Sequence, residues 1–213
     1  MPLNVKSYTL LTGGKSVTNR RNVKSGNDRP TDGHERSKNF LGETEVEQLL
    51  DAARKNRHGG RDYLLLLMMY RHGLRVSEAT AIKLADLNLQ QARLWIRRLK
   101  NGLSVEHPLA GDELRAIKRY LKTRDSALPW LFLSERGQSM TRQSVNYIIA
   151  TAAPRAGLGP IHPPMLRHSC GFYLANRGYD LRLIQDYLGH RDPKHTVHYT
   201  RVAAYRFENL WRS

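Results

Sequence analysis

Residues 188–199 have the sequence Leu188-Gly189-His190-Arg191-Asp192-Pro193-Lys194-His195-Thr196-Val197-His198-Tyr199, and this stretch decides how the fold is interpreted. A histidine, His190, stands nine residues before a tyrosine, Tyr199. Two arginines lie upstream in distinctive settings, Gly73-Leu74-Arg75-Val76-Ser77-Glu78 and Met165-Leu166-Arg167-His168-Ser169. Guanidinium groups can fork onto phosphate oxygens, a histidine can donate to them, and a tyrosine hydroxyl can act as a nucleophile. The pattern indicates the chemistry of covalent attack on a phosphodiester.

The net charge is the strongest signal in the composition. The 213 residues include 35 lysines and arginines against 19 acidic residues, a formal charge of +16. Such an excess predicts affinity for a polyanion, usually nucleic acid, although a solvated basic surface or a membrane-surface patch also fits the charge alone. No apolar run approaches the ~20 residues of a membrane-spanning helix. The single cysteine, Cys170, excludes an intrachain disulfide framework, fits a reducing compartment and is expected to be a packing residue.

Residues 1–38 have the composition of a basic, disordered tail. Gly, Ser, Asn, Thr and Arg dominate, and eight basic residues outnumber three acidic ones. The tail could touch DNA phosphates or be an unstructured leader of no consequence, and its composition does not separate these interpretations. We expect residues 39–213 to form one folded domain.

Hydrophobic periodicity and capping signals predict a mainly α domain with one small antiparallel β-sheet. Helices are expected at about 44–55, 61–72, 78–84, 112–123, 141–153, 164–177 and 180–188, with a short helix after Asp192-Pro193 and an amphipathic piece at 203–211. The first helix begins with the capping-box pattern Thr44-Glu45-Val46-Glu47, and Ser77 is expected to cap the third. Leu94-Trp95-Ile96 and Leu103-Ser104-Val105 predict two strands around an Asn101-Gly102 turn.

Three basic side chains are candidates for binding or protonating a phosphodiester. An arginine three residues before a glutamate is usually an exposed pair of little consequence, but Arg75 falls in a tight turn where Glu78 could hold it rigidly. Arg167 interrupts an apolar helical stripe and therefore needs an anionic partner. Lys100 precedes the predicted turn, where lysines are usually just solvated. Its functional interpretation is a general acid beside a leaving oxygen.

The ordered motifs resemble a known family. Residues from about Phe40 to Trp211 are similar to the catalytic domain of tyrosine recombinases, the lambda-integrase family, and most of all to the fimbrial phase-variation recombinases of the Fim and Mrp type. The matching stretches are His72 to Glu78, Arg98-Leu99-Lys100-Asn101-Gly102, Met165 to Phe172, and Leu183 to Arg191 followed by His195-Thr196-Val197 and Tyr199-Thr200. The resemblance implies the tyrosine recombinase catalytic-domain fold for a mainly α chain.

The resemblance assigns a role to each matching residue. Tyr199 would be the nucleophile, forming a 3′-phosphotyrosyl bond and releasing a 5′-hydroxyl. The scissile phosphate would be bound by Arg75, Arg167 and His190, the leaving oxygen protonated by Lys100, and Arg75 oriented by Glu78. No metal or other cofactor is implied, because the covalent bond conserves the energy of the broken phosphodiester.

One position departs from the family pattern. Three residues before Arg167, where the family has a histidine or sometimes a lysine, this chain has Pro164. Proline suits the first turn of a helix but can neither donate to a phosphate nor accept the proton of Tyr199. His162 could reach in from the preceding loop, or it could be a loop histidine with a local structural bond. Loss of a base of this kind typically slows an enzyme by about 10²–10⁴-fold without abolishing its activity.

The remaining histidines of these motifs have weaker functional interpretations. His168 follows Arg167 within the family pattern and is expected to be structural. His195 and His198 have a spacing that could suggest a metal site, but no carboxylate or thiol stands evidently beside them, so a metal site is not expected.

The resemblance implies a site-specific recombinase that inverts a promoter segment for fimbrial or other surface genes. The protein would act as a homotetramer on double-stranded DNA with short inverted repeats, together with DNA-bending accessory proteins. A cytoplasmic bacterial protein associated with the nucleoid, without membrane partners, is expected. One alternative is a DNA-binding regulator that keeps the fold and has weak or lost catalysis, as Pro164 permits. A relaxing activity like that of type IB topoisomerases is another. A membrane-surface protein would leave the motifs unexplained.

Overall fold

The computed structural model describes residues 39–201, so the predicted tail at 1–38 and amphipathic piece at 203–211 lie outside the described residues. The helices are α1 (Glu43–Arg54), α2 (Gly59–Arg71), α3 (Val76–Thr80), the 3₁₀ helix η1 (Leu84–Asp86), α4 (Gly111–Thr123), α5 (Arg142–Arg155), α6 (Pro163–Asn176), α7 (Leu181–Leu188) and α8 (Lys194–Arg201). The strands β1 (Leu87–Asn88), β2 (Arg93–Ile96) and β3 (Val105–Pro108) form one antiparallel sheet in that order. The prediction of a mainly α fold with a small antiparallel sheet is confirmed.

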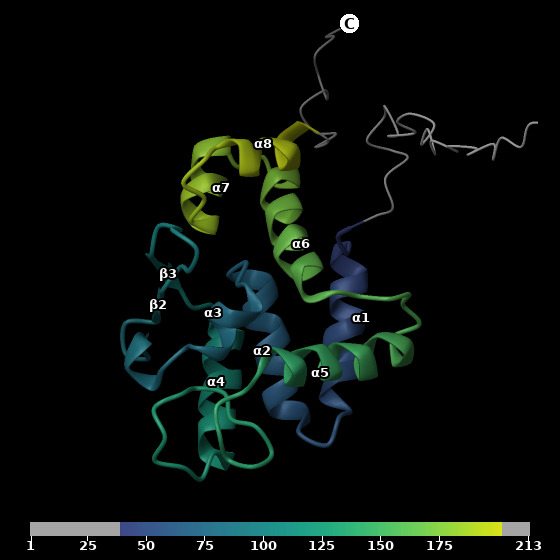
Figure 1. Ribbon diagram of the computed structural model, residues 1–213, viewed down its shortest axis with the longest axis vertical. Coiled ribbons are helices and arrows are strands. Elements are labelled where there is room, and N and C mark those ends of the chain that lie inside the picture. Colours follow the sequence, from purple (N-terminus) through teal and green to yellow (C-terminus); the bar gives the residue numbers. More distant parts are fainter. Residues whose placement is uncertain (1–38, 202–213) are drawn as a thin grey trace, which may run out of the picture. The chain divides into compact units, whose positions relative to one another are not determined.

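The main core is built around α2, whose residues 64–69 are apolar and completely buried. This helix packs against α1, α4 and α6, which surround it in Figure 1. A helix that is apolar on all sides needs such an enclosed position, because every face removes hydrocarbon from water. Within residues 39–201 no helix is long and apolar enough to cross a membrane.

A second hydrophobic cluster joins α6, α7 and α8, which lie together in Figure 1. Its buried members are Cys170, Phe172, Ala175, Ile184, Leu188 and Tyr199. Cys170 is the packing residue that the sequence predicts, and burial raises the pKa of its thiol to about 12. The cluster holds Tyr199 as one of its core residues.

Several helices begin one or two residues earlier than predicted, and in α1 and α3 the boundary has the same physical cause. Helix α1 follows Gly42, whose backbone N–H donates to Glu45 Oε2 at 2.7 Å, so Thr44 is not its cap. Helix α3 follows Arg75, whose N–H donates to Glu78 Oε2 at 3.0 Å, so Ser77 is not the cap either. In both helices a glutamate three residues after the cap accepts the first free N–H and sets the boundary.

The predicted hairpin turn forms one residue earlier than Asn101-Gly102: the Gly102 N–H donates to the carbonyl of Leu99 at 3.2 Å, which places Lys100 and Asn101 at the centre of the turn. The last paired residues of the hairpin are Ile96 and Val105, so residues 97–104 form a longer loop and the second strand starts at Val105. Lys100 and Asn101 adopt left-handed backbone angles, with φ of 55° and 60°. The Leu103 N–H donates to the carbonyl of Gly189 at 3.2 Å, at the end of α7, so this loop pairs with a distant helix end instead of extending the hairpin ladder. The short strand β1 was not predicted.

Candidate active site

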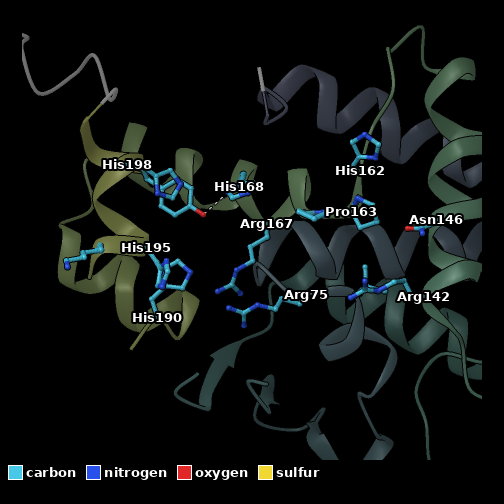
Figure 2. A pocket seen from close by; sticks show the side chains of 14 residues that line it. Arg75, Arg142, Asn146, His162, Pro163, Arg167, His168, His190, His195 and His198 are labelled. Atoms are coloured by element: carbon cyan, nitrogen blue, oxygen red, sulfur yellow. Dashed lines mark hydrogen bonds between the residues drawn. The ribbon is translucent and has the colours of Figure 1, made fainter. Parts of the chain in front are cut away.

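A cavity of about 620 Å³ collects most of the predicted site residues. Its lining comes from α3, α5, α6 and α8 and the segments beside them, and includes Arg75, His162, Pro164, Arg167, His190 and Tyr199. In Figure 2 the side chains of Arg75 and Arg167 lie next to each other and face His190 and His195. Residues far apart in the sequence therefore converge on one cavity.

Glu78 holds the arginines of the cavity in place. Its Oε1 accepts a 2.7 Å hydrogen bond from Arg75 Nη1, and its Oε2 lies 3.8 Å from Arg167 Nη1. Arg167 also donates to the carbonyls of Gly73 and Leu188, the second at 2.8 Å. Burial alone would raise the pKa of Glu78, but its contacts with the Arg75 backbone and the Arg98 guanidinium lower it overall. The carboxylate therefore stays charged and fixes the direction of both guanidinium groups.

Arg98 is a member of this cluster that sequence reasoning missed. Its guanidinium donates to Glu78 Oε2 at 3.0 Å and to the carbonyls of Gly73, His72 and Tyr187 at 3.2, 2.9 and 2.8 Å. A signal was present in the sequence, because Leu94 and Ile96 are buried in alternation and Arg98 continues the same face. An arginine at that register must find partners inside the protein.

The cluster has more positive charge than its carboxylate can neutralise. Three guanidinium groups (Arg75, Arg98 and Arg167) share Glu78, which leaves a formal charge of +3 − 1 = +2. Burial, together with Arg98 and Arg75 nearby, lowers the pKa of Arg167 to about 10. A cavity wall of this charge attracts an anion, and paired guanidinium groups suit the oxygens of a phosphate.

His190 is neutral and fixed in the cavity wall. Its Nδ1 lies 2.8 Å from Thr196 Oγ1, and its carbonyl accepts from Gln185 Nε2 at 3.0 Å. Burial, with Arg167 and Arg75 nearby, lowers its pKa to about 3. In the neutral tautomer whose Nδ1 accepts from the Thr196 hydroxyl, the imidazole carries its proton on Nε2, where it can donate to a phosphate oxygen.

Tyr199 is 1% exposed and rests against α6. A Cβ atom at Gly171 would lie 2.6 Å from the Tyr199 ring, so only a glycine allows this approach. The ring also contacts His198, with centroids 3.8 Å apart, and its hydroxyl lies 3.0 Å from Nδ1 of His168. Burial raises the pKa of the hydroxyl to about 12 although Arg167 lowers it. His168, expected to be structural, therefore contacts the predicted nucleophilic atom.

Two other predicted positions, Lys100 and His162, lie apart from the arginine pair. Lys100 is exposed on the 97–104 loop and does not line the cavity. That loop is tied to Gly189, the residue before His190, so Lys100 is anchored beside the site and not inside it. His162 precedes α6 at the cavity rim, and Figure 2 shows it well apart from Arg75.

Pro164 lines the cavity from the first turn of α6 and is exposed. It offers no donor or acceptor side chain at this wall. Among residues 39–201, no group of three or more His, Cys, Asp or Glu side chains is arranged to hold a metal ion.

Several known proteins resemble this chain in sequence. Residues 39–206 match the Phage integrase family. The type 1 fimbriae regulatory protein FimB of Escherichia coli strain K12 is 46% identical over 181 residues, which cover 83% of this chain and 90% of that protein. FimE of the same strain is 45% identical, with coverage of 81% and 90%. Tyrosine recombinase XerA of Pyrococcus furiosus is 35% identical, with coverage of 77% and 57%.

Solved structures resemble it in fold. A crystal structure of XerA recombinase matches with a TM-score of 0.71 at 27% identity, covering 82% of this chain and 66% of that one. The pre-cleavage complex of XerH recombinase with its difH substrate matches with a TM-score of 0.67 at 23% identity, covering 82% and 53%. The predicted fold class is confirmed by these likenesses.

Proposed function

The chain belongs to the phage integrase family and is a tyrosine recombinase, and from this premise we propose that it cuts and rejoins DNA at specific sites through a 3′-phosphotyrosyl bond to Tyr199. The observation that carries the proposal is the single cavity lined by Arg75, Arg167, His190 and Tyr199. A nucleophile, two guanidinium groups and a neutral imidazole donor are the groups that such an attack requires.

The proposed reaction exchanges one phosphodiester for another. Tyr199 Oη attacks the scissile phosphorus, the bond to the 5′-oxygen breaks, and the phosphate becomes attached to the tyrosine. Arg75 and Arg167 stabilise the charge that develops on the phosphate oxygens, with His190 as a further donor. We assign protonation of the leaving 5′-oxygen to Lys100, whose loop is tied beside His190.

The biological version of the proposal is promoter inversion. The fimbrial regulatory proteins match this chain over 90% of their own length, which supports a role in switching surface-gene expression. We propose that the substrate is double-stranded DNA with short inverted repeats, held by four copies of the chain with DNA-bending accessory proteins. A bacterial cytoplasmic location at the nucleoid follows from that substrate.

One observation favours a second candidate, a DNA-binding regulator with weak or lost turnover. Pro164 presents no proton donor or acceptor to the cavity. The basic charge and the arginine cluster would still bind DNA phosphates in such a protein.

The two candidates separate in a trapping experiment on a nicked suicide substrate made from DNA that flanks the gene. We expect a covalent protein–DNA adduct with the wild type, its loss in Tyr199→Phe, and a larger yield in Pro164→His. Specific binding of that DNA without any wild-type adduct would favour the regulator. Relaxation of a supercoiled plasmid that lacks the repeats would favour a topoisomerase-like activity instead.

A further inference from the structure

The hydroxyl of Tyr199 has an imidazole directly in contact with it. His168 Nδ1 lies 3.0 Å from the hydroxyl oxygen, within the range at which a base can take a proton. His168 and Gly171 are three residues apart on α6 and therefore share one face of that helix. The ring of Tyr199 packs against Gly171, and its hydroxyl contacts Nδ1 of His168, so one turn of α6 positions the whole side chain.

A base is needed at this position. With its pKa raised to about 12, roughly one Tyr199 hydroxyl in 10⁵ is ionised at pH 7. A weak nucleophile of this kind is activated by an adjacent base. Pro164 offers none, and Nδ1 of His190 is occupied by Thr196 at 2.8 Å. His162 lies well apart from the arginine pair in Figure 2.

We propose that His168 accepts the proton of the Tyr199 hydroxyl as its oxygen attacks the scissile phosphorus. The inference rests on the proposed recombinase function and deepens it. The Oη–P bond forms, the bond from phosphorus to the 5′-oxygen breaks, and the proton moves from Oη to Nδ1 of His168. The 5′-oxygen takes its proton from the separate acid assigned to Lys100. In religation each transfer runs in reverse, and the imidazolium of His168 returns the proton to Tyr199.

The electrostatics of the cavity suit this role once DNA is bound. Burial, with Arg167 nearby, lowers the pKa of His168, which favours the neutral imidazole; in the tautomer protonated at Nε2, its Nδ1 accepts the hydrogen bond of the Tyr199 hydroxyl. A scissile phosphate beside Arg75 and Arg167 would bring negative charge to the same cavity. That charge offsets the arginines and stabilises the imidazolium that forms during attack.

Chemical rescue tests the proposal. Single-turnover cleavage of a nicked suicide substrate is measured for the wild type, His168→Ala and the matched control His198→Ala. The control also removes an imidazole packed on Tyr199, but one that contacts the ring and not the hydroxyl. We expect His168→Ala to be slower by about 10²–10⁴-fold. Added imidazoles should restore its cleavage in proportion to their base strength and should not do so in His198→Ala.

The substitution His168→Asn distinguishes two roles of His168: positioning the Tyr199 hydroxyl by a hydrogen bond and accepting its proton. Its amide can still form a hydrogen bond to Tyr199 but is not basic. We expect this variant to bind DNA like the wild type and to cleave as poorly as His168→Ala. Wild-type cleavage in His168→Asn or His168→Ala, or rescue that ignores base strength, would overturn the role of His168. If the wild type forms no adduct dependent on Tyr199, the recombinase function itself fails, which is a different result.

Discussion

Arg98 Nη1 donates a 3.0 Å hydrogen bond to Glu78 Oε2, and both side chains are buried. This contact connects the end of the β2–β3 hairpin to α3. The same guanidinium reaches carbonyls at the end of α2 and in α7, so one side chain joins three segments that surround the cavity. The positions of Arg75 and Arg167 therefore depend on a residue that does not line the cavity.

Arg98→Met is expected to lower the free energy of unfolding by about 3–5 kcal/mol, because it leaves Glu78 buried with a lost partner. Denaturant titration measures the change. The control is Arg182→Met, which removes a 2.9 Å pair with Asp186 in which both side chains are exposed, and it should cost about 1 kcal/mol or less. Equal effects of the two substitutions would mean that the buried cluster does not stabilise the fold.

Gly171→Ala should displace Tyr199. The added Cβ would lie 2.6–2.7 Å from three atoms of the tyrosine ring, closer than carbon atoms can approach. We expect covalent adduct formation to fall by at least about tenfold, because a misplaced nucleophile loses its alignment with the phosphate. DNA binding should persist, since the arginines are untouched.

The control for this substitution is Gly60→Ala in α2, where an added Cβ meets no atom within 4 Å. Alanine favours a helix more than glycine does, so this variant should be as stable as the wild type or slightly more stable. Adduct formation in Gly171→Ala at the wild-type level would show that the ring can leave α6 without loss of function.

The sequence predicted those contacts of the site that join residues close together in the chain. Arg75 and Glu78 are three residues apart, so their contact follows from helix geometry. The burial of Arg98 was also accessible, from the alternation of its strand. In contrast, the contact of His168 with Tyr199 joins residues on two helices and depends on how α6 packs against α8.

The hairpin shows how a distant contact can shorten a strand ladder although the local turn still forms. A tight turn closes between Leu99 and Gly102, but the Leu103 N–H that follows donates to the carbonyl of Gly189 and not across the hairpin. A Cβ on Gly189 would lie 2.6 Å from the Leu103 carbonyl, so the close approach depends on glycine there. Sequence periodicity does not reveal such a pairing between segments that are far apart in the chain.

A buried chain of polar groups predicts a loss of stability in acid. Glu113 Oε1 lies 3.0 Å from His72 Nε2, and His72 Nδ1 lies 3.1 Å from His107 Nδ1. His107 Nε2 lies 3.0 Å from the carbonyl of Tyr187, which can only accept, so this nitrogen carries a proton. Nδ1 of His107 must then accept a hydrogen bond from Nδ1 of His72. Protonation of His107 at Nδ1 would break this hydrogen bond, so the native state disfavours the charged imidazolium.

Burial, together with His72 and Arg98, lowers the pKa of His107 in the native state to about 2, against about 6.5 in the unfolded chain. Below pH 6.5 the unfolded chain therefore binds a proton that the native state does not. The contribution of neutral His107 to the free energy of unfolding is therefore fully present above pH 6.5. It is lost progressively as the pH falls toward 2. Between pH 7 and pH 5 we expect His107 to lower the free energy of unfolding by about 2 kcal/mol. Denaturant titrations at both pH values should show a smaller loss in His107→Gln, and an identical loss would contradict this assignment.

Lys100→Ala should lower the cleavage rate, and a substrate with a better leaving group should restore it. If Lys100 protonates the leaving 5′-oxygen, its loss should cost about 10²–10⁴-fold in the cleavage rate. A substrate with sulfur in place of that bridging oxygen leaves as a thiolate, which needs no protonation because thiols are much stronger acids than alcohols. The sulfur substrate should therefore restore cleavage by Lys100→Ala. It should not restore cleavage by Arg75→Ala, whose guanidinium stabilises charge on the non-bridging oxygens. If the sulfur substrate restores cleavage by both variants or by neither, Lys100 is not the general acid. Lys100 would then be a solvated loop residue, in agreement with its position outside the cavity lining.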